Sequence, residues 1–177
     1  MFAWKGINFM ICCVTGHRPK GFPFSRSSDG CEYTEYMDSL YREIEFLIKE
    51  GYVDFITGMA DGADIDFAEC VLTLRTSYEQ ITLEAALPYP VPERKRVTEK
   101  TKILDEILKS ADHQHVVSPY YHGGCMQKRN QYMVDKSDLV LAIWNGECHG
   151  GTWNTIQYAQ SIGKPVRKIL LHSFNLN

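Results

Sequence analysis

The sequence predicts an α/β fold in which an open, mainly parallel sheet carries helices on both faces. Short apolar runs alternate with segments of helical periodicity along the 177 residues, and polar or glycine-rich turns follow several of the apolar runs. Alternating elements of this length imply right-handed crossover connections, which make successive strands parallel and bury both faces of the sheet.

Six segments are expected as strands. The first, residues 9–15, is an unbroken apolar run, which suits a strand covered on both faces. The third is closed by Pro88, Pro90 and Pro92, which cannot sit within a central ladder. The expected strands are residues 9–15, 53–57, 81–87, 115–117, 138–143 and 166–171.

Five segments of helical periodicity lie between these strands. The clearest is residues 37–48, where apolar side chains recur at i, i+3 and i+4 and Gly51 follows the end. The expected helices are residues 37–48, 64–74, 97–108, 124–136 and 151–162. Since no repeat, low-complexity tract or linker divides the chain, we expect residues 1–177 to form a single domain.

Composition narrows the class of protein. The chain has 44% hydrophobic residues and no apolar run near the roughly 20 residues that cross a bilayer. The first ten residues lack a basic region and a cleavage site, so we expect no signal peptide and a cytoplasmic location. The six cysteines form no Cys-x-x-Cys pair and are expected as reduced thiols, and the histidines lack the spacing of metal ligands. No metal site is therefore expected.

The charge pattern argues against a polyanionic partner. The net charge is −3 at pH 7, and no basic stripe is available to neutralise a phosphate backbone. The densest basic cluster, residues 94–96, is surrounded by carboxylates and is interpreted as a solvated helix face. Neither nucleic acid nor a membrane is therefore expected as a partner.

Polar or glycine-rich clusters follow three of the expected strands at their carboxyl ends. In open α/β sheets, ligands bind in the crevice outside these ends. Paired glycines at a helix start let backbone N–H groups approach an anion, and a neighbouring hydroxyl adds a donor. The sequence therefore predicts a ligand site here. The candidate ligand-binding residues are Thr15, Gly16, His17, Arg18, Gly58, Asp61, Gly62, Asp64, Arg129, Asn130, Trp144, Asn145, Gly150, Gly151 and Thr152.

The loop clusters also have a purely structural interpretation. Glycines in loops can simply permit a positive φ. One of Asp61 and Asp64 is expected as a helix N-cap, while the other could accept hydrogen bonds from ribose hydroxyls. Glu69 could be a surface residue on the same helix. His17 and Arg18 are as consistent with an exposed loop as with ligand contact.

The candidates on the later elements leave alternatives open as well. Arg129 and Asn130 share a helical stripe with two methionines, so their side chains should face inward. A buried guanidinium needs either a carboxylate such as Asp135 or Asp138, in a structural ion pair, or a ligand phosphate. Trp144 could cap the core or stack on a base.

Four motifs of the chain occur in the order found in a known superfamily. They are Thr15-Gly16-His17-Arg18-Pro19, Gly58-Met59 with Gly62-Ala63-Asp64 and Glu69, Arg129-Asn130 with Met133-Val134-Asp135, and Trp144-Asn145-Gly146 with Gly150-Gly151-Thr152. On these motifs the chain resembles the SLOG superfamily of Rossmann-like proteins. That superfamily joins the Lonely-Guy cytokinin-activating enzymes, DprA-like DNA-processing proteins and the YpsA-like group of uncharacterised bacterial proteins. The chain is most similar to the YpsA-like group.

The resemblance implies one SLOG-type nucleotide-binding domain whose ligand lies in the crevice. It implies a nucleotide-derived small molecule, of an ADP-ribose-like or nucleoside-monophosphate-like kind, without fixing a cofactor, and it leaves a homo-oligomer open. Lonely-Guy enzymes carry a Met-x-x-Arg element, present here from Met126 to Arg129. They also carry a Gly-Gly-x-Gly-Thr-x-x-Glu element whose carboxylate supports N-glycosidic cleavage, and here Thr155 stands where that Glu would be. A hydroxyl cannot replace the carboxylate that an oxocarbenium-like state needs.

Three functions follow in order of preference. The first is binding, and in that way sensing, of a nucleotide-derived ligand without catalysis. The second is a Lonely-Guy-like phosphoribohydrolase that cleaves the N-glycosidic bond of a nucleoside 5′-phosphate, provided that Asp61, Asp64 or Glu69 reaches the ribose. The third is a DprA-like single-strand DNA binder, which the charge pattern disfavours.

Overall fold

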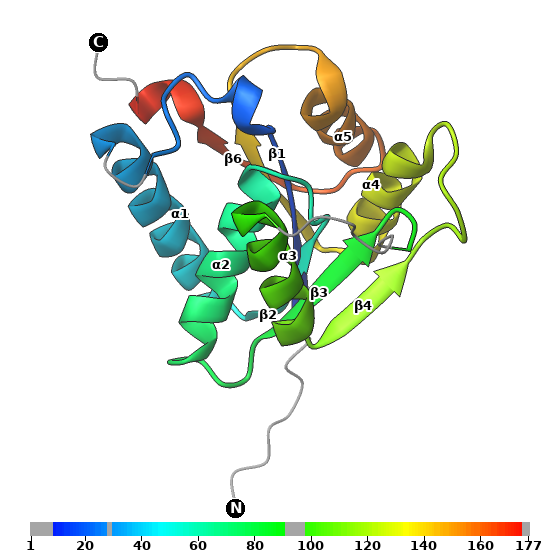
Figure 1. The fold of residues 1–177 in the computed structure, drawn as a ribbon, viewed down its shortest axis with the longest axis horizontal. Helices are drawn as coiled ribbons and strands as arrows, with labels where there is room; N and C mark the ends of the chain where they lie inside the picture. The colour runs from blue at the N-terminus through cyan, green and yellow to red at the C-terminus, as the bar shows by residue number, and fades with distance from the viewer. Residues whose placement is uncertain (1–8, 28–29, 91–97, 175–177) are drawn as a thin grey trace, which may run out of the picture.

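A six-stranded parallel sheet forms the centre of the protein, with the strand order β4-β3-β2-β1-β5-β6 (Figure 1). Every neighbouring pair of strands is parallel. The computed structural model describes residues 9–27, 30–90 and 98–174. The predicted α/β class with an open parallel sheet is confirmed.

Strands and helices alternate along the chain, as the periodicity predicted. The strands are β1 (Met10–Gly16), β2 (Tyr52–Thr57), β3 (Thr82–Leu87), β4 (His113–Val116), β5 (Leu139–Trp144) and β6 (Val166–Leu170). The helices are α1 (Cys31–Lys49), α2 (Ala63–Arg75), α3 (Glu99–Ser110), α4 (Cys125–Lys136) and α5 (Gly150–Ser161), with 3-10 turns η1 (Pro19–Gly21) and η2 (Leu171–Phe174). Helix α1 begins earlier than predicted because Tyr33 and Tyr36 extend its apolar stripe.

Different helices cover the two faces of the sheet. Helices α1, α2 and α3 lie on one face, and α4 and α5 pack together on the other (Figure 1). Along β1, Cys12 and Val14 belong to the core under α1 and α2, whereas Cys13 belongs to the core under α4 and α5. The unbroken apolar run of β1 is therefore explained by burial on both faces. All six cysteines of the chain are free thiols.

The strand order changes direction at β1, which pairs with β2 on one side and with β5 on the other. The crevice outside the carboxyl ends at such a switch is where open α/β sheets bind ligands. At this end β1 packs unusually close to α2, since a Cβ on Gly16 would lie 2.3 Å from the Cβ of Ala63. The turn after β1 is thereby held against the start of α2.

The prediction that Asp61 or Asp64 caps α2 is wrong. The N-cap is Gly62, and no side chain accepts a hydrogen bond there. The Ala63 N–H donates instead to the carbonyl oxygen of His17 at 3.1 Å. A backbone acceptor from the β1 turn therefore takes the place that a capping carboxylate would fill.

Two further expectations concern the surface of the chain. The basic cluster at residues 94–96 lies outside the described residues. Within the described part of the chain, no helix is long and apolar enough to span a membrane.

Candidate functional site

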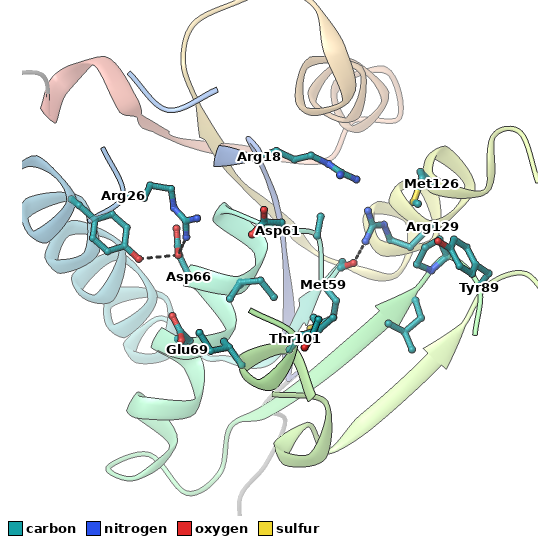
Figure 2. A pocket seen from close by; sticks show the side chains of 18 residues that line it. Arg18, Arg26, Met59, Asp61, Asp66, Glu69, Tyr89, Thr101, Met126 and Arg129 are labelled. Atoms are coloured by element: carbon teal, nitrogen blue, oxygen red, sulfur yellow. Dashed lines mark hydrogen bonds and ion pairs between the residues drawn. The ribbon is translucent and has the colours of Figure 1, made fainter. Parts of the chain in front are cut away.

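A cavity of about 650 Å³ opens beside the carboxyl ends of β2 and β3, between α2, α3 and α4 (Figure 2). This volume is in the range of sites that take small molecules, roughly 300–1,000 Å³. Charged side chains from four segments of the chain line it. They are Arg18, Arg26, Asp61, Asp66, Glu69 and Arg129.

Two guanidiniums converge in this cavity from different elements. Arg18 follows β1 and Arg129 lies on α4, and Figure 2 shows the two side chains pointing toward one another. The guanidinium of Arg18 is exposed and has no hydrogen bond or ion pair with another of the described residues. Burial lowers the pKa of Arg129 from its ordinary value, Asp64 opposes that shift, and the charge of Arg18 adds to it. An anion between the two guanidiniums would relieve their repulsion.

Arg129 is buried and held by three groups. Its Nη1 donates to the carbonyl oxygen of Gly58, and its Nε donates to Oδ1 of Asn130 at 2.8 Å. Nη1 also lies 3.9 Å from Oδ2 of Asp64. A Cβ on Gly58 would lie 2.1 Å from Nη1, so a glycine is required for this approach. The glycine after β2 therefore serves to seat the guanidinium.

The acidic partner of Arg129 is Asp64, so the expectation of a carboxylate partner is met by another residue than Asp135 or Asp138, the two that were named. Those two carboxylates are exposed and accept hydrogen bonds from groups elsewhere. Asp64 is only 6% exposed. Burial raises the pKa of Asp64 above its ordinary value, and Arg129 opposes that rise. Arg129 and Asp64 thus form a buried ion pair beside the cavity, whereas the Arg18 guanidinium has no carboxylate partner among the described residues.

Asp66 is a completely buried acid in the wall of the cavity. It forms an ion pair with Arg26, and the hydroxyls of Tyr33 and Tyr36 donate to it at 3.1 and 3.2 Å. Burial raises the pKa of Asp66, while Arg26 and the two tyrosine hydroxyls lower it. This network ties the loop before α1 to α2.

Glu69 lies one turn further along α2 and is half-buried in the same cavity (Figure 2). Burial and the charge of Asp66 raise its pKa. Its carboxylate has no hydrogen bond or ion pair with another described residue. Asp61 lines the cavity as well. The cavity therefore has both guanidiniums and carboxylates in its wall.

The start of α5 lines a second, smaller hollow of about 300 Å³. Gly151 and Asn130 lie in its wall, and Met126 borders both hollows. Asn130 Nδ2 donates to the Thr155 hydroxyl at 2.9 Å, and that hydroxyl donates to the Gly151 carbonyl at 2.8 Å. Of the two predicted phosphate-binding glycines, Gly151 thus lies in a different hollow from Arg129.

Several other candidates line neither hollow. Trp144 stacks on Trp153, with ring centroids 5.5 Å apart, and its Nε1 donates to the Glu147 carbonyl. The ring is therefore occupied by a protein partner. Burial lowers the pKa of His17, and its Nε2 has no hydrogen-bond partner within the described ranges. The remaining candidates outside both hollows are Thr15, Gly16, Gly62, Asp64, Asn145, Gly150 and Thr152.

The sequence reasoning missed Asp66, Arg26 and Tyr33. The sequence contained one signal for Asp66. This residue belongs to the stripe of α2 residues spaced at i, i+3 and i+4, and the structure buries that stripe against the core. An acid in such a stripe needs partners, and its position predicts a buried polar network. No comparable pattern marks Arg26, which lies in an irregular loop.

Comparison with known proteins gives a family for most of this chain. Residues 12–169 match the model of the YspA SLOG family. The Uncharacterized SPbeta prophage-derived protein YoqJ of Bacillus subtilis (strain 168) is 32% identical over 136 residues, which is 70% of this chain and 79% of that protein. A UPF0398 protein of Bacillus pumilus (strain SAFR-032) is 25% identical over 154 residues, or 85% of this chain and 82% of that one.

A solved structure shares the fold at low sequence identity. It is DNA processing protein A from Helicobacter pylori, described for its single-stranded DNA binding mode, with a TM-score of 0.58 and 19% identity. The match covers 90% of this chain and 64% of that one.

The prediction that nucleic acid is not a partner is overturned by this structural neighbour. It was based on the net charge of −3, yet the same fold occurs in a protein described as binding single-stranded DNA. Net charge is an average over the whole chain, whereas a nucleic acid contacts only local groups, so a value of −3 does not exclude such a partner.

Proposed function

The chain belongs to the YspA SLOG family, and from this membership and the two converging guanidiniums we propose that its cavity binds a nucleotide-derived ligand. The observation that carries the proposal is the approach of Arg18 to Arg129 in one cavity at the carboxyl ends of the strands. Only one of the two guanidiniums has a carboxylate partner among the described residues. A phosphate supplies the missing negative charge, and the planar guanidinium suits it.

The carboxylates of the cavity are suited to the ribose hydroxyls of such a ligand. Asp61 and Glu69 line the same cavity as the guanidiniums. Carboxylates accept hydrogen bonds from ribose hydroxyls in many nucleotide sites. We place the phosphate at Arg18 and Arg129 and the ribose toward Asp61 and Glu69, within one domain of residues 1–177.

The first prediction is a ligand-dependent rise in melting temperature. AMP, ADP, ADP-ribose and NAD at millimolar concentration should stabilise the protein, because a ligand at a hundredfold excess over its Kd adds about 2.7 kcal/mol. Arg18→Ala should weaken binding of the best ligand by roughly 10- to 150-fold, the equivalent of about 1.5 to 3 kcal/mol for a hydrogen bond to a charged group. Differential scanning fluorimetry and calorimetric titration measure both effects.

Two comparison variants locate the phosphate. Lys20→Ala removes a nearby positive charge that lines neither hollow and should leave affinity unchanged. Gly151→Val adds a side chain whose Cβ has open space around it, so the apo protein should fold normally. If Gly151→Val abolishes the shift and Arg18→Ala does not, the phosphate lies at the start of α5 and the placement at Arg18 is wrong. A panel that leaves the melting temperature unchanged contradicts ligand binding itself.

A second candidate function is N-glycosidic cleavage of a nucleoside 5′-phosphate, and Glu69 is the observation that favours it. The Thr155 hydroxyl is engaged between α4 and α5, so it offers no carboxylate chemistry. Glu69 instead lines the larger cavity with a raised pKa. Protonated Glu69 can donate to the leaving base while Asp61 takes a proton from the water that adds to the anomeric carbon.

The second prediction tests this chemistry through Glu69→Gln. Base release from nucleoside 5′-phosphates, followed by chromatography, should fall by about 10²- to 10⁴-fold while ligand affinity is retained, because general acid catalysis contributes that much. Wild-type activity should decline as the pH rises through the raised pKa of Glu69, since only the protonated acid donates. Glu106→Gln, on the exposed surface of α3, is the matched control. Absence of base release in the wild type excludes the glycosidase and leaves the binding proposal intact.

A third candidate is single-stranded DNA binding, which the shared fold of DNA processing protein A from Helicobacter pylori favours. A strand would place a phosphate at Arg18 and Arg129 just as a free nucleotide would. A salt-dependent mobility shift with single-stranded DNA separates this candidate from binding of a mononucleotide alone.

A further inference from the structure

An aromatic surface adjoins the cavity on the side away from Asp66. Tyr89, which follows β3, lines the cavity and lies beside Met126 and Arg129 in Figure 2. Tyr121, from the segment between β4 and α4, contacts Tyr89 edge-on, with ring centroids 5.4 Å apart. Tyr120 precedes it. We call Tyr89, Tyr120 and Tyr121 the tyrosine platform.

The platform is open to solvent to an unusual degree for such large side chains. Tyr120 is 68% exposed and Tyr121 is 69% exposed, the two highest values among the exposed large hydrophobic residues of the described chain. Single exposed hydrophobic residues are common and need no explanation. Here the Tyr121 ring contacts Tyr89, which lines the proposed nucleotide site, so at these two rings the aromatic surface is continuous with the cavity. The Tyr120 ring packs edge-on against His122, with centroids 6.1 Å apart.

We propose that the tyrosine platform stacks the base that follows the nucleotide bound in the cavity, so that the protein binds a short single strand of nucleic acid. This inference rests on the proposed function, because the guanidiniums must first fix a phosphate next to the platform. Aromatic side chains stack on any base, since every base has a π-face. Sites for single strands combine such rings with cationic groups that bind the backbone phosphates.

The openness of the platform favours a strand over a small dinucleotide. Small molecules bind in concave sites that bury about 70–90% of their surface. Rings that are more than two-thirds exposed cannot enclose the second half of a dinucleotide, but they offer a surface along which a chain can continue. Affinity for a strand should then come more from stacking than from charge, which agrees with a chain of net charge −3.

The test compares ligands of increasing length by calorimetric titration. The probes are dAMP and dTMP, their 5′-phosphorylated dinucleotides, and the 5′-phosphorylated tetranucleotides of each base. A second base should raise the affinity about 5- to 150-fold, which corresponds to the roughly 1 to 3 kcal/mol of one base stacked on an aromatic ring. Tyr121→Ala should remove this gain without changing the affinity for the mononucleotide, and Tyr121→Phe should keep it. Phe46→Ala, at an exposed aromatic on α1, is the control.

The dependence of the binding affinity on salt concentration should differ from that of a polycationic DNA-binding protein. With one phosphate held between the two guanidiniums, the slope of log K against log salt should be about −0.7, the value for one phosphate neutralised on a single strand.

The outcomes separate this inference from the proposed function. If mononucleotides bind but a second base adds nothing, or if Tyr121→Ala keeps the gain, the platform is not a base site and the cavity proposal stands. If the dinucleotide binds more tightly than the mononucleotide but the tetranucleotide does not, the ligand is a small dinucleotide and a strand is excluded. Failure of every probe to bind overturns both proposals.

Discussion

Replacing Arg129 with alanine should lower the free energy of unfolding by about 3 to 5 kcal/mol at neutral pH, the cost of removing one partner from a buried ion pair. Arg129 is 5% exposed and Asp64 is 6% exposed, so water reaches neither charge freely. The truncation leaves the Asp64 carboxylate with the Ala60 N–H, at 3.2 Å, as its only hydrogen-bond donor among the described residues. It also removes the donor to the Gly58 carbonyl.

The loss should become smaller as the pH falls. Burial already raises the pKa of Asp64, and Arg129 counteracts that rise. Without Arg129 the pKa of Asp64 in the folded state rises further above its unfolded value. A carboxyl with a raised folded pKa costs stability above that pKa, and the cost disappears as the pH falls below the unfolded value. Urea denaturation of the variant at pH 7 and near pH 4 should therefore show partial recovery, measured against the wild type at each pH.

A double variant separates the stranded charge from lost packing. Arg129→Met with Asp64→Asn removes both charges and should be more stable than Arg129→Met alone, since replacing both partners of a buried pair is often close to neutral. If Arg129→Ala costs less than about 1 kcal/mol, the guanidinium is not part of the scaffold. Its role would then be confined to the ligand, and the assignment of Asp64 as its structural partner would be wrong.

The element pattern was predictable because it depends on local periodicity. The strand β1 could be identified from its apolar run and α1 from its i, i+3, i+4 stripe, and the alternation of elements implied the parallel sheet. The ends of elements were less predictable, since Tyr33 and Tyr36 extend α1 through contacts with residues distant in the sequence. The strand order itself follows from packing between helices and sheet, which periodicity does not encode.

The candidate site was predictable in outline and less so in its contacts. That Arg129 faces inward follows from its helical stripe, and the structure buries it. Its partner could not be identified, because Asp64 is distant in the sequence and approaches Arg129 only in the folded protein, from a helix on the opposite face of the sheet. Likewise, the sequence could not show that Gly151 and Arg129 lie in separate hollows, since the placement of α4 relative to the start of α5 depends on packing.

The glycines show this limit most clearly, because a sequence does not say why a position needs one. Gly58 admits the Arg129 guanidinium, Gly62 admits the backbone of the β1 turn, and Gly151 has open space around it. All three were candidate ligand contacts, and the sequence favoured Gly151 because it is paired with Gly150 at a helix start. Substitution distinguishes them, since a Cβ is harmful where protein atoms already occupy its place or where φ is positive.

Gly62→Ala should be the most destabilising of the glycine substitutions, costing about 4 kcal/mol or more, a size that single changes rarely reach. Its φ is +101°, and a Cβ there would lie 2.4 Å from the carbonyl oxygen of His17. That oxygen accepts the Ala63 N–H at 3.1 Å, so it cannot move aside without breaking the connection between the β1 turn and α2. The Cβ would also lie 2.9 Å from the Cα of Arg18, so the turn that positions the free guanidinium would be displaced.

Gly51→Ala supplies the matched control, because Gly51 has nearly the same φ, +100°, but a Cβ there would approach only the end of the Met10 side chain, at 3.5 Å. It should cost about 1 to 2 kcal/mol, the penalty for a side chain in the left-handed region. The difference between the two variants in chemical denaturation therefore measures the overlap with the β1 turn together with the additional backbone strain at Gly62, whose ψ is −129°. Equal losses at the two positions would mean that the turn yields without cost, and the close approach of β1 to α2 would then not be what fixes Arg18 in the cavity.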